Sequence, residues 1–134
     1  MKWYKLAAAQ GNAGAQYNLG SVYSEGDGVT IDKVEAVKWY RLAAVQGLAD
    51  AQLNLGNAYI KGDGVSIDKA EAVKWFRLAA AQGLAGAQFN MGALYLNGEG
   101  VDIDKVEGSK WMKLDAENGS PDAITYLKSH HQPH

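Results

Sequence analysis

Ser66, Asp68 and Lys69 have the residue types and spacing of a nucleophilic centre. The stretch Ser66-Ile67-Asp68-Lys69 matches the Ser-x-x-Lys pattern, in which a lysine amine next to a serine hydroxyl supports acyl transfer. The same place 36 residues earlier reads Thr30-Ile31-Asp32-Lys33, and no Ser-Asp-Asn or Lys-Thr-Gly partner motif occurs in the chain. We therefore interpret Asp68 as a helix cap and predict that the chain has no catalytic residues and is not an enzyme.

Histidines and acidic loops are the other possible sources of chemistry. His130, His131 and His134 all lie in the segment 130–134, which we expect to be a flexible tail, so none is expected to act as a buried base. The Gly26-Asp27-Gly28 loop lacks the alternating oxygen ligands and the distant glutamate of a calcium site. The chain has no cysteine for a thiolate site. We expect no metal and no cofactor.

The overall charge argues against some classes of partner. A formal net charge of -2 provides no basic field for nucleic acid. Lys38 and Arg41 begin a basic row that acidic residues one turn earlier neutralise, so we expect a solvated face there. No apolar run approaches the roughly 20 residues that span a bilayer, and no signal peptide is visible. We expect a soluble chain without membrane insertion, cytoplasmic by default.

Internal repetition determines the expected architecture. Four tryptophans and four glycines recur every 36 residues, namely Trp3, Trp39, Trp75 and Trp111 with Gly11, Gly47, Gly83 and Gly119. Each unit carries two apolar stripes of helical period, one on a helix A (Ala15, Leu19, Val22, Tyr23) and one on a helix B (Ala36, Trp39, Tyr40, Ala43). Gly20, which recurs as Gly56 and Gly92, is expected to let the neighbouring helix approach closely.

The connection between helix A and helix B contains the expected turn and cap residues. Gly26 and Gly28 permit the positive φ that ends helix A. Asp32 and Glu35 predict a capping box at the start of helix B, and Asp68 with Glu71 repeats it.

These patterns predict an all-α, right-handed α-solenoid of antiparallel helix pairs over residues 1–129. It comprises a partial helix B (about 2–10), repeats at about 12–47, 48–83 and 84–119, and a closing helix (about 121–129). In the last helix B, the alanine positions become Asp115 and Gly108. We attribute this change to a terminal helix that has no following neighbour.

The repeat motifs resemble those of a known family. Ala-Gln-x-Asn-Leu-Gly-x-x-Tyr, Gly-Asp-Gly-Val and Glu-Ala-Val-Lys-Trp-Tyr-Arg-Leu-Ala-Ala-x-Gln-Gly are similar to the Sel-1-like repeat, a relative of the tetratricopeptide repeat, from residue 2 to about 128. The resemblance implies a superhelix that acts as an adaptor for other proteins, in bacterial signalling, envelope processes and host interaction or in eukaryotic protein quality control. Some bacterial relatives hold each repeat with a disulfide, and this chain, without cysteine, departs from them.

In such solenoids helix A lines the concave surface, so its residues opposite the apolar stripe are the candidate partner-binding residues. They are Tyr17, Asn18, Ser21, Ser24, Leu53, Asn54, Asn57, Ile60, Phe89, Asn90, Ala93 and Leu96. One alternative is that Tyr17, Leu53 and Phe89 pack between successive A helices. Another is that the recurring asparagines bond to a loop backbone.

The leading functional hypothesis is a scaffold or adaptor that binds a protein or peptide in this concave surface. The alternative is an immunity-type inhibitor that blocks a bacterial toxin. An unpaired helix B at the N-terminal end also predicts self-association through its exposed stripe.

Overall fold

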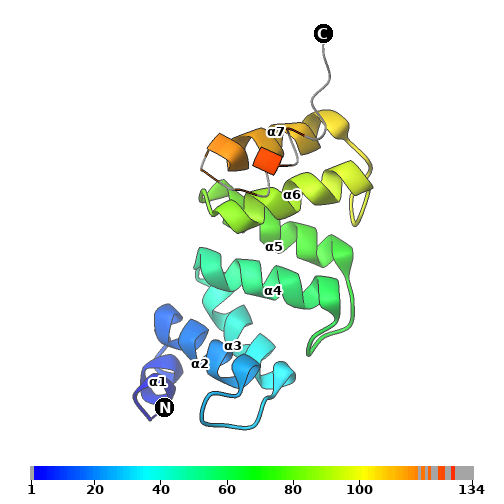
Figure 1. Ribbon diagram of the computed structural model, residues 1–134. Helices are drawn as coiled ribbons and strands as arrows, with labels where there is room; N and C mark the ends of the chain where they lie inside the picture. Colours follow the sequence, from blue (N-terminus) through cyan, green and yellow to red (C-terminus); the bar gives the residue numbers. More distant parts are fainter. Residues whose placement is uncertain (1, 118, 120, 122–123, 126–127, 129–134) are drawn as a thin grey trace.

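The chain folds into helices stacked one on the next (Figure 1). The computed structural model describes residues 2–117, 119, 121, 124, 125 and 128, with the backbone alone for residues 2–4. The described helices are α1 (Lys2–Ala9), α2 (Ala13–Glu25), α3 (Lys33–Val45), α4 (Ala49–Lys61), α5 (Lys69–Ala81), α6 (Ala85–Asn97) and α7 (Lys105–Glu117). We call α2, α4 and α6 the A helices, and α1, α3, α5 and α7 the B helices.

Each helix packs against the one before it and the one after it, and α1 and α7 lie at opposite ends of the stack (Figure 1). This arrangement confirms the all-α solenoid of helix pairs with a 36-residue period. Of the expected closing helix at 121–129, only Pro121, Ile124, Thr125 and Lys128 are described, and they are helical. The expected tail 130–134 lies outside the described residues. Among the helices that are described, none has the length and apolar character needed to cross a membrane.

The predicted cap residues begin the B helices, but the capping box is only half correct. Asp32 Oδ1 accepts a hydrogen bond from the backbone nitrogen of Glu35 at 3.1 Å, and Asp68 does the same for Glu71 at 3.1 Å. The Glu35 carboxylate does not return to the cap. It accepts a hydrogen bond from Trp39 Nε1 at 3.2 Å, because the half-buried indole needs an acceptor.

The predicted close approach at the helix A glycine is confirmed. A Cβ on Gly56 would lie 2.6 Å from Phe76 Cε1, and a Cβ on Gly20 would lie 2.8 Å from the ring of Tyr40. Phe76 is 1% exposed and belongs to a core cluster with Met91. The glycine therefore accommodates the large side chain of helix B, which offsets its cost of roughly 1 kcal/mol in helix propensity.

Buried glutamines on the A helices connect successive helices. Gln52 is 3% exposed, and its Nε2 donates to the carbonyl oxygen of Ala44 in α3 at 3.1 Å. Its Oε1 accepts from Nε2 of Gln82, at the end of α5, at 2.9 Å. Gln16 makes the corresponding bonds to Ala8 at 3.1 Å and from Gln46 at 2.8 Å. One amide group thus links three consecutive helices.

Contacts between repeats also involve a residue that was expected in the solvated basic row. Arg41 is half-buried, and its Nη2 donates to the Tyr59 hydroxyl of the next repeat at 2.7 Å. Arg77 bonds to Tyr95 in the same way at 2.7 Å. The expectation was wrong for Arg41, because it considered neutralising charges on the same helix and not the neighbouring A helix.

The explanation for the polar substitutions in α7 was also wrong. Asp115 is fully buried, and Gly108 is buried against Leu96 of α6. Gly108, Met112 and Asp115 follow a spacing of four and three residues, so they share the side of α7 that contacts Gly92 of α6. This side is interior, and the absence of a following helix does not account for its composition.

We predict that Gly64→Ala destabilises the fold more than Gly28→Ala. Both glycines have φ of 77°, so each alanine variant loses about 1–2 kcal/mol from backbone strain. A Cβ on Gly64 would overlap the backbone of Lys33 and Val34 in the preceding repeat, whereas a Cβ on Gly28 meets no atom within 4 Å. Urea denaturation followed by circular dichroism should show a further loss of about 1–3 kcal/mol for Gly64→Ala. Equal losses would contradict the proposed contact between repeats.

We also predict that Gln52→Met lowers the free energy of unfolding by about 1–3 kcal/mol. The substitution removes two hydrogen bonds of a buried amide, each worth about 0.5–1.5 kcal/mol, while Ala44 O keeps its bond from Gly47 N and Gln82 Nε2 keeps its bond to Gly47 O. Gln10→Met is the matched control, because Gln10 is exposed at the equivalent place of Gln46 and Gln82. The prediction fails if the two variants unfold at the same urea concentration.

Candidate functional site

A polar cleft lies between two A helices, with a B helix as its floor. Its volume is about 250 Å³. It is lined by Ser24 and Glu25 of α2, by Lys33, Ala36, Val37 and Tyr40 of α3, by Asn54, Asn57, Ala58 and Lys61 of α4, and by Asp63. We call this site the α2–α4 cleft.

Asn54 and Asn57 provide free, uncharged hydrogen-bonding groups in the α2–α4 cleft. They lie three residues apart on α4 and therefore on one face of the helix. Both are half-buried, and neither side chain makes a hydrogen bond to any described part of the chain. An asparagine amide offers two donors and an acceptor, which matches the donor and acceptor of a peptide unit.

Three other polar side chains of the cleft, those of Ser24, Lys33 and Tyr40, are already engaged. Lys33 Nζ donates to the carbonyl oxygen of Ser24 at 2.9 Å and to its hydroxyl at 3.1 Å. The hydroxyls of Tyr40 and Ser21 lie 3.2 Å apart. These bonds fix the floor and one wall of the cleft.

The twelve candidate partner-binding residues predicted from the sequence differ in their burial and in whether they line the cleft. Ser24, Asn54 and Asn57 line the α2–α4 cleft together. Asn18 is exposed, and the remaining eight residues are half-buried, namely Tyr17, Ser21, Leu53, Ile60, Phe89, Asn90, Ala93 and Leu96.

Two of the predicted apolar anchors contact the core of the next repeat. Tyr17 packs against the cluster that contains Leu55, and its ring centroid lies 5.8 Å from that of Tyr40. Leu53 packs against the next cluster, close to Gly86 of α6. Packing between repeats therefore accounts for part of the surface of both residues. By contrast, Asn18, Asn54 and Asn90 make no side-chain bond to a described loop backbone.

Sequence reasoning missed the floor and one end of the cleft. Tyr40 and Lys33 lie on helix B, whereas the helical-wheel argument considered helix A alone. Lys61 and Asp63 come from the end of α4 and the following loop. The signal that could have indicated Lys33 is a lysine that recurs at the first position of α3, α5 and α7, as Lys33, Lys69 and Lys105.

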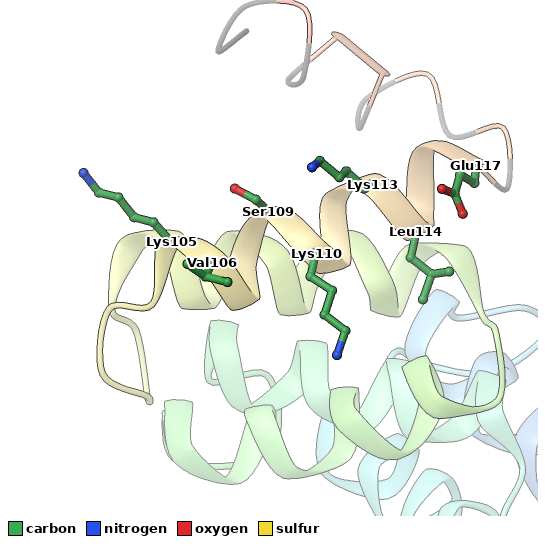
Figure 2. A pocket seen from close by; sticks show the side chains of 7 residues that line it. All are labelled: Lys105, Val106, Ser109, Lys110, Lys113, Leu114 and Glu117. Carbon is green, nitrogen blue, oxygen red and sulfur yellow. The ribbon is translucent and has the colours of Figure 1, made fainter. Parts of the chain in front are cut away.

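A second pocket, of about 750 Å³, lies along one side of α7 (Figure 2). Its described lining residues all belong to this helix, and Lys105, Ser109 and Lys113 project from one side of it. Ser109 occupies the repeat position of Val37, which is 5% exposed in the cluster shared with α4. We interpret this face as a repeat-packing surface and assign it no ligand.

The Ser-x-x-Lys stretch has structural partners. Asp68 caps α5, and Lys69 Nζ lies 3.3 Å from Glu99 Oε1. The lysine is therefore held by an ion pair between repeats. Among the described residues, no group of three or more histidine, cysteine, aspartate or glutamate side chains is placed to hold a metal ion.

The predicted self-association through α1 stays a prediction. Leu6 of α1 is 58% exposed, which leaves an apolar side chain available at this end of the stack. A single exposed leucine does not identify what contacts it.

The repeat units match a known family model along the chain. The Sel1 repeat model matches residues 1–12, 13–48, 49–84 and 85–120. No curated protein matches the chain at a significant level.

Three similar solved structures come from bacteria. A protective antigen of uropathogenic Escherichia coli with an SLR fold is 46% identical at a TM-score of 0.92, over 96% of this chain. The chain spans 28% of the length of that antigen. A Sel1 repeat protein from Oxalobacter formigenes is 36% identical at a TM-score of 0.86, over 94% of this chain and 95% of that one.

Cysteine-rich protein B of Helicobacter pylori shares the fold, at 20% identity and a TM-score of 0.73, over 94% of this chain and 90% of that one. The source organisms of the Escherichia coli and Oxalobacter structures point to a bacterial origin for this chain. Sel1 repeat proteins are generally protein-interaction scaffolds, and the fold is generally non-enzymatic. With its repeats matched over residues 1–120, the chain belongs to the Sel1 repeat family.

Proposed function

We propose that the chain is a scaffold or adaptor that binds an extended segment of a partner protein along the concave surface formed by α2, α4 and α6. The observation that carries this proposal is the α2–α4 cleft, in which Asn54 and Asn57 offer amide groups without partners in the described chain. An open, half-buried amide is suited to bond the main chain of a ligand, because a peptide unit presents one donor and one acceptor.

The repeat extends this surface beyond one cleft. Asn90 on α6 stands one period after Asn54 and is half-buried in the same way. Two equivalent amides, one on each of two successive A helices, support a ligand that runs along the stack and bonds through its backbone. Apolar side chains beside them, such as Ile60 and Leu96, are half-buried and offer side-chain contacts.

We predict that Asn54→Ala combined with Asn90→Ala weakens peptide binding about tenfold or more. The peptide is selected from a displayed random library on the unmodified chain, and its affinity is measured by fluorescence anisotropy. Each lost hydrogen bond is worth about 0.5–1.5 kcal/mol, and about 1.4 kcal/mol corresponds to a tenfold change. Thermal unfolding by circular dichroism checks that the variant stays folded.

Lys38→Ala combined with Lys74→Ala is the matched control. Both lysines lie on B helices with side chains 64% and 63% exposed, in pairs with Glu35 and Glu71 that contribute little to stability. Their removal should leave the affinity unchanged. Equal weakening by both double variants, or binding that survives the loss of both asparagines, would assign the peptide to another surface.

A further inference from the structure

Successive repeats present different chemistry at equivalent positions of the concave surface. In the α2–α4 cleft, Ser24, Tyr40 and Asn57 provide two hydroxyls and an amide. One period later these positions are Ile60, Phe76 and Ala93. Ile60 and Ala93 are half-buried, whereas Phe76 is 1% exposed and belongs to the core beneath them. The three polar groups of the first site are thus replaced by hydrocarbon, while Asn54 and Asn90 keep the amide on each A helix.

From this difference we infer that the protein binds a peptide segment of a defined side-chain order. The segment places an uncharged polar side chain in the α2–α4 cleft and an apolar side chain at the α4–α6 surface. This inference rests on the proposed binding of a peptide along the A helices. It adds the order of side chains that such a peptide must have.

The size and charge of the α2–α4 cleft support an uncharged polar side chain. Its volume of about 250 Å³ is below the roughly 300–1,000 Å³ of small-molecule sites, so it suits one side chain with its backbone. Lys33 and Lys61 are balanced by Glu25 and Asp63, and the cleft has no net charge. Asparagine, glutamine, serine and threonine satisfy these conditions.

The second position suits an apolar side chain for the opposite reason. Ile60 and Ala93 are half-buried, so part of each side chain stays accessible at the surface. Lys69 and Glu99 lie 3.3 Å apart, so their opposite charges offset each other at this surface. An apolar ligand side chain gains by leaving water there, whereas a polar one loses its hydrogen bonds.

The spacing of the two positions follows from the geometry of the helices. Helices that pack directly lie about 8–10 Å apart, and successive A helices, which each pack against the B helix between them, are separated by at least this distance. Because an extended chain rises about 3.3 Å per residue, the ligand places the two side chains at least about three residues apart.

The test is selection of a displayed random dodecapeptide library on three proteins. They are the unmodified chain, the triple variant Ser24→Ile, Tyr40→Phe, Asn57→Ala, and the reverse triple variant Ile60→Ser, Phe76→Tyr, Ala93→Asn. Each substitution introduces the residue that the chain itself has one repeat away. The unmodified chain should enrich peptides with an uncharged polar residue at one fixed separation, of at least about three positions, from an apolar one.

The first triple variant should select two apolar positions and bind the original peptide about tenfold or more weakly, and the reverse variant should select two polar positions. If the unmodified chain selects the same residue class at both positions, or a charged residue at the first, the inference is wrong and peptide binding stands. If the unmodified chain selects no peptide, both the inference and the proposed function are wrong. Should one variant fail to fold, the other variant and the unmodified chain still decide between these outcomes.

Discussion

The buried glutamines of the A helices fix how each helix is placed on the next. Gln52 contacts the end of α3 through Ala44 and the end of α5 through Gln82, so a single amide relates three helices. A buried amide is costly unless it is bonded, and this requirement permits few relative placements of the helices. The spacing of the A helices, and with it the width of the α2–α4 cleft, depends on this constraint repeated along the chain.

Close contacts at glycines also fix the distance between helices, in addition to the hydrogen bonds of the buried glutamines. Gly56 brings α4 and α5 together over Phe76, and the backbone of Gly64 approaches Lys33 of the preceding repeat. The first contact lies within a helix pair and the second joins two pairs. Because both recur with the period, small differences in helix placement add up along the stack and determine its curvature.

The fold was predictable because each structural requirement occurs at a fixed period, as with the caps at Asp32 and Asp68. The choice of partner for a side chain was less predictable. Glu35 was assigned to its own cap and instead bonds Trp39, and Arg41 bonds a tyrosine 18 residues further along the chain. Both interactions depend on which groups are buried and on contacts with neighbouring helices, and spacing along one helix contains neither. The same limit applies to the α2–α4 cleft. Some of its residues on the A helices were predicted from the sequence, but its floor, which belongs to helix B, was not.

Comparison of the repeats within this one chain separates structural from variable positions. Gln16, Gln52 and Gln88 are the same residue at one position, because the helix links require that amide. The position of Asn57 holds serine in α2 and alanine in α6, at half-buried sites where packing accepts all three. Variation at a position that the fold does not restrict allows one scaffold to present different chemistry at successive steps. The buried glutamine position is therefore constant along this chain, whereas the half-buried position of Asn57 on the A helices varies.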